Sequence, residues 1–472
     1  MSTQSLFTKP RTFETQNNIR SLLHSQQDTM LSLRKRALNN GLRQRRSLTT
    51  WMNHIEDLIQ SKEISLENIT ESIPKIIEMF PSLVPNGEAF KKSLHLLSLI
   101  SSTNNINYTK LLISNGLLSI LSGVIKYYYR STEKYPQDVL TDIKYIIGNI
   151  AAEKKQFNFC QELAHISSVE FLIITMDVNA PEKELWALSN LIDSDISLNE
   201  GIDSALLGKL YYILINRNEI KDSRDKSIYY AIKTLYFYMS YHVNAAINAF
   251  SHLQIFNLIC AILLEEVIKP VTNKEENIVE LILNIVNCII TEDEFTLQTL
   301  LVVKSPFLHT ITEILMKPEV LEAIKETIFL ILNNILNLND MCYQEHILNE
   351  RTTRVLINSK SKEALCCLSS MTACKMRMSL LKSMGALTKA IDIITSSQDE
   401  TERTIAYEIL YNFLEYISPQ YIECREIIKE CVQKGIEDFL HRDSNNEKNK
   451  ELSEQATALI EFYFDNRVSN EM

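Results

Sequence analysis

The clearest chemical signal in this sequence is an indole and an amide one helical turn apart, in the stretch KELWALSNLI at residues 183–192. Side chains four residues apart project from the same face of a helix, so Trp186 and Asn190 are either buried together or line one surface together. An indole face attracts cations, and a carboxamide both donates to and accepts from a peptide backbone. An exposed pair would therefore suit an extended peptide that carries basic side chains.

Similar apolar segments recur along the chain, and each carries an amide or a replacement for it at a comparable place. These places are residues 99, 149, 190, 241, 287, 333, 370 and 412, which are 37 to 51 residues apart. Such spacing is typical of armadillo or HEAT repeats, whose units stack only on their neighbours and form an extended concave groove. We expect the recurrent helices to line that groove with a ladder of side-chain pairs: Tyr145 with Asn149, Trp186 with Asn190, Phe237 with Tyr241, Leu283 with Asn287, and Phe329 with Asn333.

A simpler interpretation exists for any single repeat, in which the ring fills the core and the amide satisfies nearby backbone. The recurrence argues against it, because a buried amide without partners costs roughly 1–3 kcal/mol. Acidic residues close to the pairs, such as Glu153, Asp193 and Asp195, would supply the charge opposite to that of a basic peptide.

The composition predicts an all-α chain with several stacked repeats. The 472 residues include only 9 Gly and 10 Pro, fewer turn-forming residues than extensive β structure needs. The apolar residues are spaced by three and four, which is the period of a helix. Gly116 and Gly385 interrupt long amphipathic stretches, where a residue with positive φ would end one helix and start another. We therefore expect three helices per repeat, namely a short helix, a turn at glycine, a second helix and then the recurrent one.

Other classes of site are not supported by the sequence. No apolar run reaches the roughly 18 residues that span a membrane, and the amino terminus lacks the apolar core of a signal peptide. The nine cysteines are scattered, without a CxxC pair, which favours reduced core thiols over disulfides or zinc. We expect a soluble intracellular protein without a metal or cofactor. An enzyme is disfavoured, since the histidines are dispersed and no phosphate-binding loop or GxSxG motif occurs.

The charge is divided between a basic arm and an acidic body. Residues 1–50 hold nine basic and two acidic groups, a balance of +7, so residues 51–472 carry −18 of the net charge of −11. A basic arm often binds nucleic acid or stays solvated. In this chain the acidic body would repel nucleic acid.

Several motifs together resemble the importin-alpha family, the adaptors that recognise nuclear localisation signals. They are the WALSN ladder, GNIAAE at 148–153, KEA at 362–364, the basic stretch LRKRALNNGLRQRR at 33–46, and residues 435–467, which are similar to the last repeat of the family. The resemblance implies an armadillo-repeat, right-handed superhelical solenoid with an N-terminal basic arm. It divides the chain into the arm (1–50), a linker with a partial first repeat (51–92), eight or nine repeats (93–465) and a tail (466–472).

The resemblance also implies roles for individual residues. The major cargo-peptide site falls on Thr109, Tyr145, Asn149, Glu153, Trp186, Asn190, Phe237 and Tyr241, and the minor site on Asn287, Phe329, Asn333 and Glu363. The importin-beta-binding and autoinhibitory residues fall on Arg20, Arg34, Lys35, Arg36, Arg43, Arg45 and Arg46. The pattern departs from the family at its ends, where His95 with Leu99 and Cys366 with Ser370 replace ring and amide pairs.

The implied function is nuclear import, with the protein shuttling between cytoplasm and nucleus. Its implied partners are importin-beta, cargo proteins with basic localisation signals, and an export receptor for recycling, without direct contact to nucleic acid or membrane. Two other classes stay open at this point. One is a different armadillo scaffold that binds peptides of signalling or cytoskeletal partners, and the other is a nucleic-acid-binding protein that uses its arm.

Overall fold

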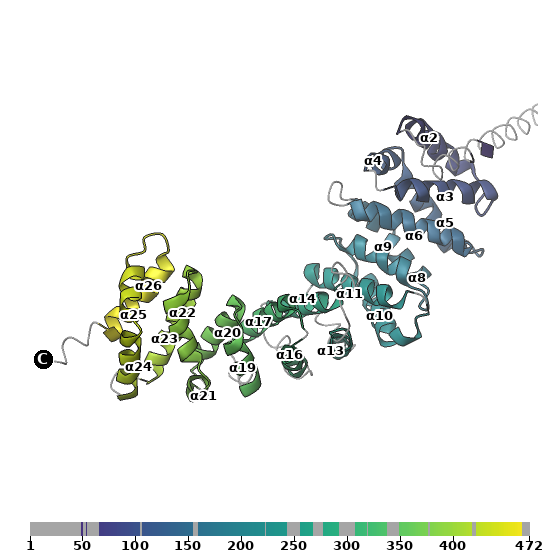
Figure 1. The fold of residues 1–472 in the computed structure, drawn as a ribbon. Coiled ribbons are helices and arrows are strands. Elements are labelled where there is room, and N and C mark those ends of the chain that lie inside the picture. The colour runs from purple at the N-terminus through teal and green to yellow at the C-terminus, as the bar shows by residue number, and fades with distance from the viewer. Residues whose placement is uncertain are drawn as a thin grey trace, which may run out of the picture. The chain divides into compact units, whose positions relative to one another are not determined.

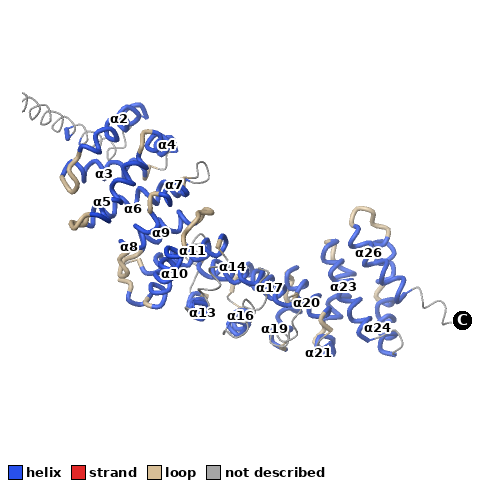
Figure 2. The backbone as a smooth tube through the Cα atoms, turned by 180° about the vertical axis from the view of Figure 1, so that it is seen from behind, coloured by secondary structure: helices blue, strands red, loops and turns tan. Residues whose placement is uncertain are grey.

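The computed structural model describes most of the chain after the basic arm, in thirteen segments. These are residues 49–50, 53, 66–103, 106–153, 159–221, 223–242, 255–267, 277–291, 307–318, 320–337, 349–375, 378–417 and 422–464. The described residues form helices, turns and loops, and none of them lies in a strand (Figure 2). The chain divides into two compact units, Met1–Phe171 and Leu172–Met472.

The described part of the first unit consists of short helices (Figure 1). Along the chain these are α2 (Leu66–Met79), η1 (Phe80–Ser82), α3 (Glu88–Ser101), α4 (Ile106–Ser114), α5 (Leu117–Arg130), α6 (Gln137–Ala152) and α7 (Cys160–His165). Helices α3 and α6 pack against each other. Their buried aliphatic residues recur every three or four positions, as Ile143, Ile146, Ile147 and Ile150 do in α6, because this spacing keeps one face of a helix in the core.

The second unit repeats the same arrangement more often. The boundary falls within α8 (Ser168–Thr175). The described elements that follow are α9 (Glu182–Ile192), α10 (Glu200–Ile215), η3 (Arg217–Glu219), α11 (Arg224–Tyr241), α13 (Ile255–Glu266), α14 (Ile278–Thr291), α16 (Phe307–Leu315), α17 (Glu322–Leu336), α19 (Glu350–Asn358), α20 (Lys362–Ala373), α21 (Met378–Ser383), α22 (Ala386–Ser396), α23 (Glu400–Ile417), α24 (Ile422–Gln433), α25 (Ile436–Ser444), α26 (Lys450–Leu459) and η4 (Ile460–Phe464).

The recurrent sequence segments coincide with helices that stack in order. In the second unit α9, α11, α14, α17, α20, α23 and α26 each contact the next, and a parallel row runs through α10, α13, α16 and α19. Contacts between consecutive layers are the defining property of a solenoid. The predicted all-α, solenoid-like class is therefore confirmed. We call the recurrent helices the ladder helices, and in the first unit they are α3 and α6.

The predicted turn between the first two helices of a repeat is confirmed at both glycines. Gly116 (φ 105°) separates α4 from α5, and Gly385 (φ 99°) separates α21 from α22. Gly435 (φ 75°) has the same place between α24 and α25, and Ser167 (φ 64°) between α7 and α8. A left-handed residue ends the short helix at a sharp angle, and glycine adopts this conformation without steric cost.

Three helices per repeat is not the rule throughout. After α9 the chain passes through a loop at residues 193–199 directly into α10, so the repeat that ends in α11 has two helices. Asn199 takes the place of the glycine turn by capping α10, with its side-chain oxygen accepting from the backbone N–H of Ile202 at 3.0 Å.

Across the described residues, no single helix is long and apolar enough to cross a membrane. The segments Asn107–Ser114 and Leu117–Arg130 reach that length and composition as a pair, with a bend of 65° between them. The eight described cysteines are free thiols, and five of them are buried.

Candidate functional site

The candidate site consists, in each of the two units taken separately, of surface positions on the ladder helices. In α9 the side chains of Trp186 and Asn190 are partly exposed, whereas Leu185, Leu188 and Leu191 between and beside them are fully buried. This pattern of burial recurs in the other ladder helices and defines two positions, four residues apart, that we call the first and second ladder positions.

The two positions hold different residue types along the chain. In the first unit they are His95 and Leu99 in α3, and Tyr145 and Asn149 in α6. In the second unit they are Trp186 and Asn190, Lys233 and Phe237, Asn284 and Cys288, Leu330 and Asn334, Cys366 and Ser370, and Glu408 and Asn412. Of these residues only Asn412 is classed as buried, at 8 % exposure.

In the first unit the structure places two predicted residues on the ladder. Tyr145 is 37 % exposed, and the amide nitrogen of Asn149 donates to the hydroxyl of Ser101 in α3 at 3.0 Å. Glu153 caps the end of α6 and is partly exposed. The role predicted for Thr109 needs correction, because this side chain is 3 % exposed in the interior of the unit and cannot touch a peptide at the surface.

Helix α11 presents an aromatic stripe that is interrupted by a lysine. Tyr229, Lys233, Phe237 and Tyr241 follow one another at four-residue intervals, and each is at least partly exposed. The prediction paired Phe237 with Tyr241. Both residues do lie on the exposed face, but Phe237 occupies the second ladder position and Tyr241, 44 % exposed, lies one turn beyond it.

The predicted minor site is wrong in its ring. Phe329 is fully buried, at the place that Leu185 has in α9, and the exposed first position of α17 is Leu330, at 43 %. Leu283 is likewise fully buried, and Asn284 takes the first position in α14. The physical reason is the spacing of the apolar residues in these helices. It places residues 283 and 329 on the helix face that packs into the core. The ladder positions of α14, α17 and α20 consequently carry no aromatic ring.

The amides of this region connect consecutive layers. The side-chain nitrogen of Asn334 donates to the side-chain oxygen Oδ1 of Asn287 at 2.8 Å, and the hydroxyl of Ser370 donates to Oδ1 of Asn333 at 2.7 Å. Asn412 donates to the hydroxyl of Thr372 at 3.0 Å. Sequence reasoning gave Asn287 and Asn333 to a ligand and missed this use, although an amide that recurs once per layer is equally suited to bond the next layer.

Two acidic groups lie on the ladder helices of the carboxyl-terminal layers, Glu408 at the first ladder position of α23 and Glu363 three residues before the first ladder position of α20. Glu363, in the first turn of α20, accepts from the hydroxyl of Ser361 at 2.6 Å, and this hydrogen bond is the main cause that lowers the pKa of its carboxyl group. Glu408 accepts from the hydroxyl of Ser369 at 2.7 Å. Burial raises the pKa of the neighbouring Cys366 thiol, so the thiol is the stable form at neutral pH.

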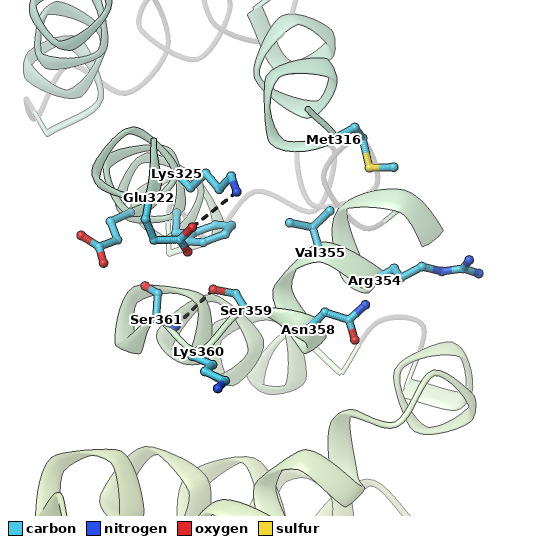
Figure 3. A pocket seen from close by; sticks show the side chains of 11 residues that line it. Met316, Glu322, Lys325, Arg354, Val355, Asn358, Ser359, Lys360 and Ser361 are labelled. Carbon is cyan, nitrogen blue, oxygen red and sulfur yellow. Dashed lines mark hydrogen bonds and ion pairs between the residues drawn. The ribbon is translucent and has the colours of Figure 1, made fainter. Parts of the chain in front are cut away.

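A separate hollow of 740 Å³ lies beside the amino-terminal half of α17. Figure 3 shows Glu322 and Lys325 of α17 on one side, with Arg354 and Val355 of α19 on the other. Two of its cations form ion pairs within the protein. Lys325 pairs with Glu322 at 3.4 Å and Arg354 pairs with Glu350 at 2.8 Å. The hollow therefore presents a mixed rather than a one-signed surface.

The basic residues assigned to importin-beta binding, Arg20, Arg34, Lys35, Arg36, Arg43, Arg45 and Arg46, lie outside the described residues. Among the residues that the structure does describe, no group of three His, Cys, Asp or Glu side chains is placed to hold a metal ion.

Comparisons with known proteins establish the fold alone. No family model matches the chain. No curated protein matches it either. Among solved structures, the chain is similar to the crystal structure of an engineered protein from the Northeast Structural Genomics Consortium, with a TM-score of 0.65 and 15 % sequence identity. The match covers 88 % of this chain and 95 % of that one.

Proposed function

We propose that this chain is a nuclear import adaptor of the importin-alpha type, which binds basic peptides on its ladder helices and importin-beta through its amino-terminal arm. The observation that carries the proposal is the placement of Trp186 and Asn190. Both side chains reach the surface of α9 at consecutive turns, while Leu185 before them and Leu188 between them are buried. A core role for the pair would have buried them as well.

The pair supplies the interactions that an extended basic peptide needs. The indole face attracts an ammonium or guanidinium group and packs against its methylene stem. The carboxamide can donate to and accept from the peptide backbone, which holds the peptide extended without reading its sequence. Asp193 at the end of α9 and Asp195 in the loop beyond it add negative charge, as does the balance of −18 over residues 51–472.

In the second unit the proposal places ring-based recognition on α9 and α11, and the first unit contributes a ring on α6 by itself. The rings in line with the ladder positions of these helices are Tyr145, Trp186, Tyr229, Phe237 and Tyr241. The layers of α14, α17 and α20 offer amide, thiol, hydroxyl and aliphatic groups, so we propose that they contribute little to binding a second basic cluster. The further partners in the proposal are cargo proteins and an export receptor, and the protein would shuttle between cytoplasm and nucleus.

The test is a fluorescence-anisotropy titration of labelled basic peptides with the full chain and with a chain that lacks residues 1–50. Trp186→Leu removes the π face and keeps apolar volume, and Trp186→Phe keeps a ring. We expect Trp186→Leu and Asn190→Ala each to weaken binding at least tenfold, which corresponds to about 1.4 kcal/mol, and Trp186→Phe to weaken it less.

Tyr212→Ala is the matched control. It removes an aromatic side chain that is 49 % exposed in α10, which is not a ladder helix, and should leave affinity unchanged. If Trp186→Leu binds basic peptides as tightly as wild type, the proposed site is wrong. If acidic peptides bind in place of basic ones, a different type of armadillo scaffold is the better explanation.

A further inference from the structure

The last two ladder layers of the second unit share a cluster of three aromatic rings. Helix α23 contributes Tyr411, and the turn η4, which continues α26, contributes Phe462 and Tyr463. The centre of the Tyr411 ring lies 6.4 Å from that of Phe462 and 5.8 Å from that of Tyr463, and the planes of these pairs are nearly perpendicular, at 76° and 77°. The Phe462 and Tyr463 rings are themselves 6.4 Å apart. We call these three residues the ring cluster.

The ring cluster has one covered side and one open side. Tyr463 is buried at 7 % exposure, whereas Phe462 is 57 % exposed and Tyr411 is partly exposed. Residues 460–464 wind as a π-helix, a wide turn that interrupts α-helices rarely and often at functional sites. The structure therefore leaves most of a phenyl ring in water beside a second partly exposed ring, and a ligand that covered them would gain free energy from the burial.

Two carboxylates flank Tyr411 on α23. Glu408 precedes it by three residues and Glu415 follows it by four, so all three side chains share one side of the helix. Glu408 accepts from the hydroxyl of Ser369 at 2.7 Å, and this neutral donor leaves the charge of the carboxylate in place. Glu415 pairs with the ammonium group of Lys375, which follows α20, at 3.0 Å.

The surroundings of the ring cluster are acidic as a whole. Helices α23 and α26 and the turn η4 together contain seven acidic and two basic residues, a balance of −5. Burial, followed by Tyr411 and the Glu415 carboxylate, raises the pKa of Tyr463 to about 12, so this negative charge acts on the cluster itself. A cation near the open side would be attracted both by ring faces and by carboxylates.

We propose that the ring cluster and Glu408 form a second peptide site, which binds an arginine side chain of an extended basic segment. A guanidinium group is planar, stacks on an aromatic face and pairs with a carboxylate in the same contact, whereas an ammonium group is compact and strongly hydrated. Phe462 and Tyr411 receive the plane of the group, and Glu408 receives its charge. This site goes beyond the proposed function, because it uses neither Trp186 nor the amino-terminal arm.

The test is photo-cross-linking of the full chain with a peptide that carries arginines on an alanine and serine background and a benzophenone side chain beside the central arginine. Mass spectrometry identifies the cross-linked residues. We expect cross-links within residues 408–416 or 460–464, in wild type and equally in Trp186→Leu. Citrulline in place of arginine keeps the planar group and removes its charge, so it should lower the yield there about fivefold or more. Lysine should lower it less.

Two variants test the parts of the site. Phe462→Leu removes the π face and keeps apolar volume, and Glu408→Gln removes the charge and keeps an acceptor for Ser369. Each should lower the cross-link yield at the ring cluster about fivefold or more. Tyr212→Ala, at an exposed ring of α10, and Glu426→Gln, at an exposed carboxylate of α24, are the matched controls and should leave the yield unchanged. Circular dichroism and thermal unfolding establish that each variant is folded.

The inference is overturned if no cross-link forms at the ring cluster, or if Phe462→Leu, Glu408→Gln or the citrulline peptide gives the wild-type yield there. None of these results touches the proposed function, which the anisotropy titration of Trp186→Leu decides. Conversely, Trp186→Leu could bind basic peptides as tightly as wild type while the cross-links still depend on Phe462 and Glu408. In that case the site on α9 fails and the site on α23 and η4 stands.

Discussion

Phe329 and Leu330 show how one residue of register separates a core side chain from a surface one. Phe329 is fully buried and Leu330 is 43 % exposed. We expect Phe329→Ala to lower the free energy of unfolding by about 3–5 kcal/mol, because it removes a buried ring and leaves a cavity. Leu330→Ala should change it by less than about 1 kcal/mol. Urea denaturation followed by circular dichroism measures both.

The pair also serves as its own control, since the two substitutions remove large apolar side chains at adjacent positions of one helix. If the two variants lose equal stability, Leu330 is covered and the assignment of ladder positions in α17 is wrong. A Phe329→Ala variant as stable as wild type would place that ring at the surface, where the sequence pattern first put it.

The exposed residues of a ladder helix could be predicted where the sequence pattern allowed only one register of the helix. The indole at 186 and the amide at 190 stand four residues apart in an otherwise apolar helix, and Tyr145 with Asn149 repeats them. In α17 two amides are adjacent, at 333 and 334, so the sequence allowed two registers and only packing selects between them. Lys233 was overlooked because a search for rings and amides passes over a lysine, although the lysine is the group that the rings flank.

At the scale of elements, a buried charged cluster joins α23 to α25. The guanidinium of Arg403 donates to the carboxylate of Asp443 at 2.8 Å, and the Tyr407 hydroxyl donates to it at 3.0 Å. Burial is the largest single influence on the pKa of Asp443 and acts to raise it, but the hydrogen bonds from Arg403, Arg442 and Tyr407 together outweigh burial and lower it. The charged form is therefore favoured in the folded protein.

Removing one partner of this cluster should destabilise the carboxyl-terminal layers. We expect Arg403→Met to lower the free energy of unfolding by about 3–5 kcal/mol at pH 7, because it leaves Asp443 charged and buried. A carboxyl group with a lowered pKa stabilises the fold above its unfolded pKa and loses that contribution as pH falls through the folded value. The difference between wild type and Asp443→Asn should accordingly shrink below about pH 4.

Urea midpoints at pH 7, 5 and 3 measure this effect. Lys450→Met is the control, since the Lys450–Glu454 pair is exposed and separated by 3.3 Å, and its loss should cost less than about 1 kcal/mol at every pH. A stability difference between wild type and Asp443→Asn that is constant from pH 7 to pH 3 would show that Asp443 does not titrate as its surroundings require.

The helix boundaries could be predicted from the sequence where a residue type with a special backbone preference, such as glycine, occurs at them. Glycine at 116 and 385 predicted two helix breaks, because its left-handed conformation is cheap. Ser167 makes the same break with a residue that nothing in the sequence singles out. The direct passage from α9 to α10 was missed because an asparagine cap there takes the place of the glycine turn.

At the scale of the whole molecule, the division of charge makes the arm a candidate regulator of the ladder. Residues 1–50 carry +7 and residues 51–472 carry −18. A tethered basic segment competes with a free peptide at an effective concentration on the order of millimolar. We expect deletion of residues 1–50 to tighten binding of a basic peptide about tenfold or more and to abolish binding of importin-beta.

Anisotropy titrations at several salt concentrations measure the first effect, and a pull-down with purified importin-beta measures the second. Replacing Arg43, Arg45 and Arg46 with alanine tests whether charge alone is responsible, and should reproduce the tightening with the chain length intact. If the deletion changes neither peptide affinity nor importin-beta binding, the arm has no part in either interaction.

The hydrogen bonds of Asn334 to Asn287, Ser370 to Asn333 and Asn412 to Thr372 each join one layer to the next and reach no further. A change in one layer is therefore felt by its two neighbours and then fades, because sites without shared partners vary independently. Such a chain can alter its surface one rung at a time. A surface of this kind changes locally, with a lysine at the α11 layer and a leucine two layers later at α17, while the rest of the stack folds as before.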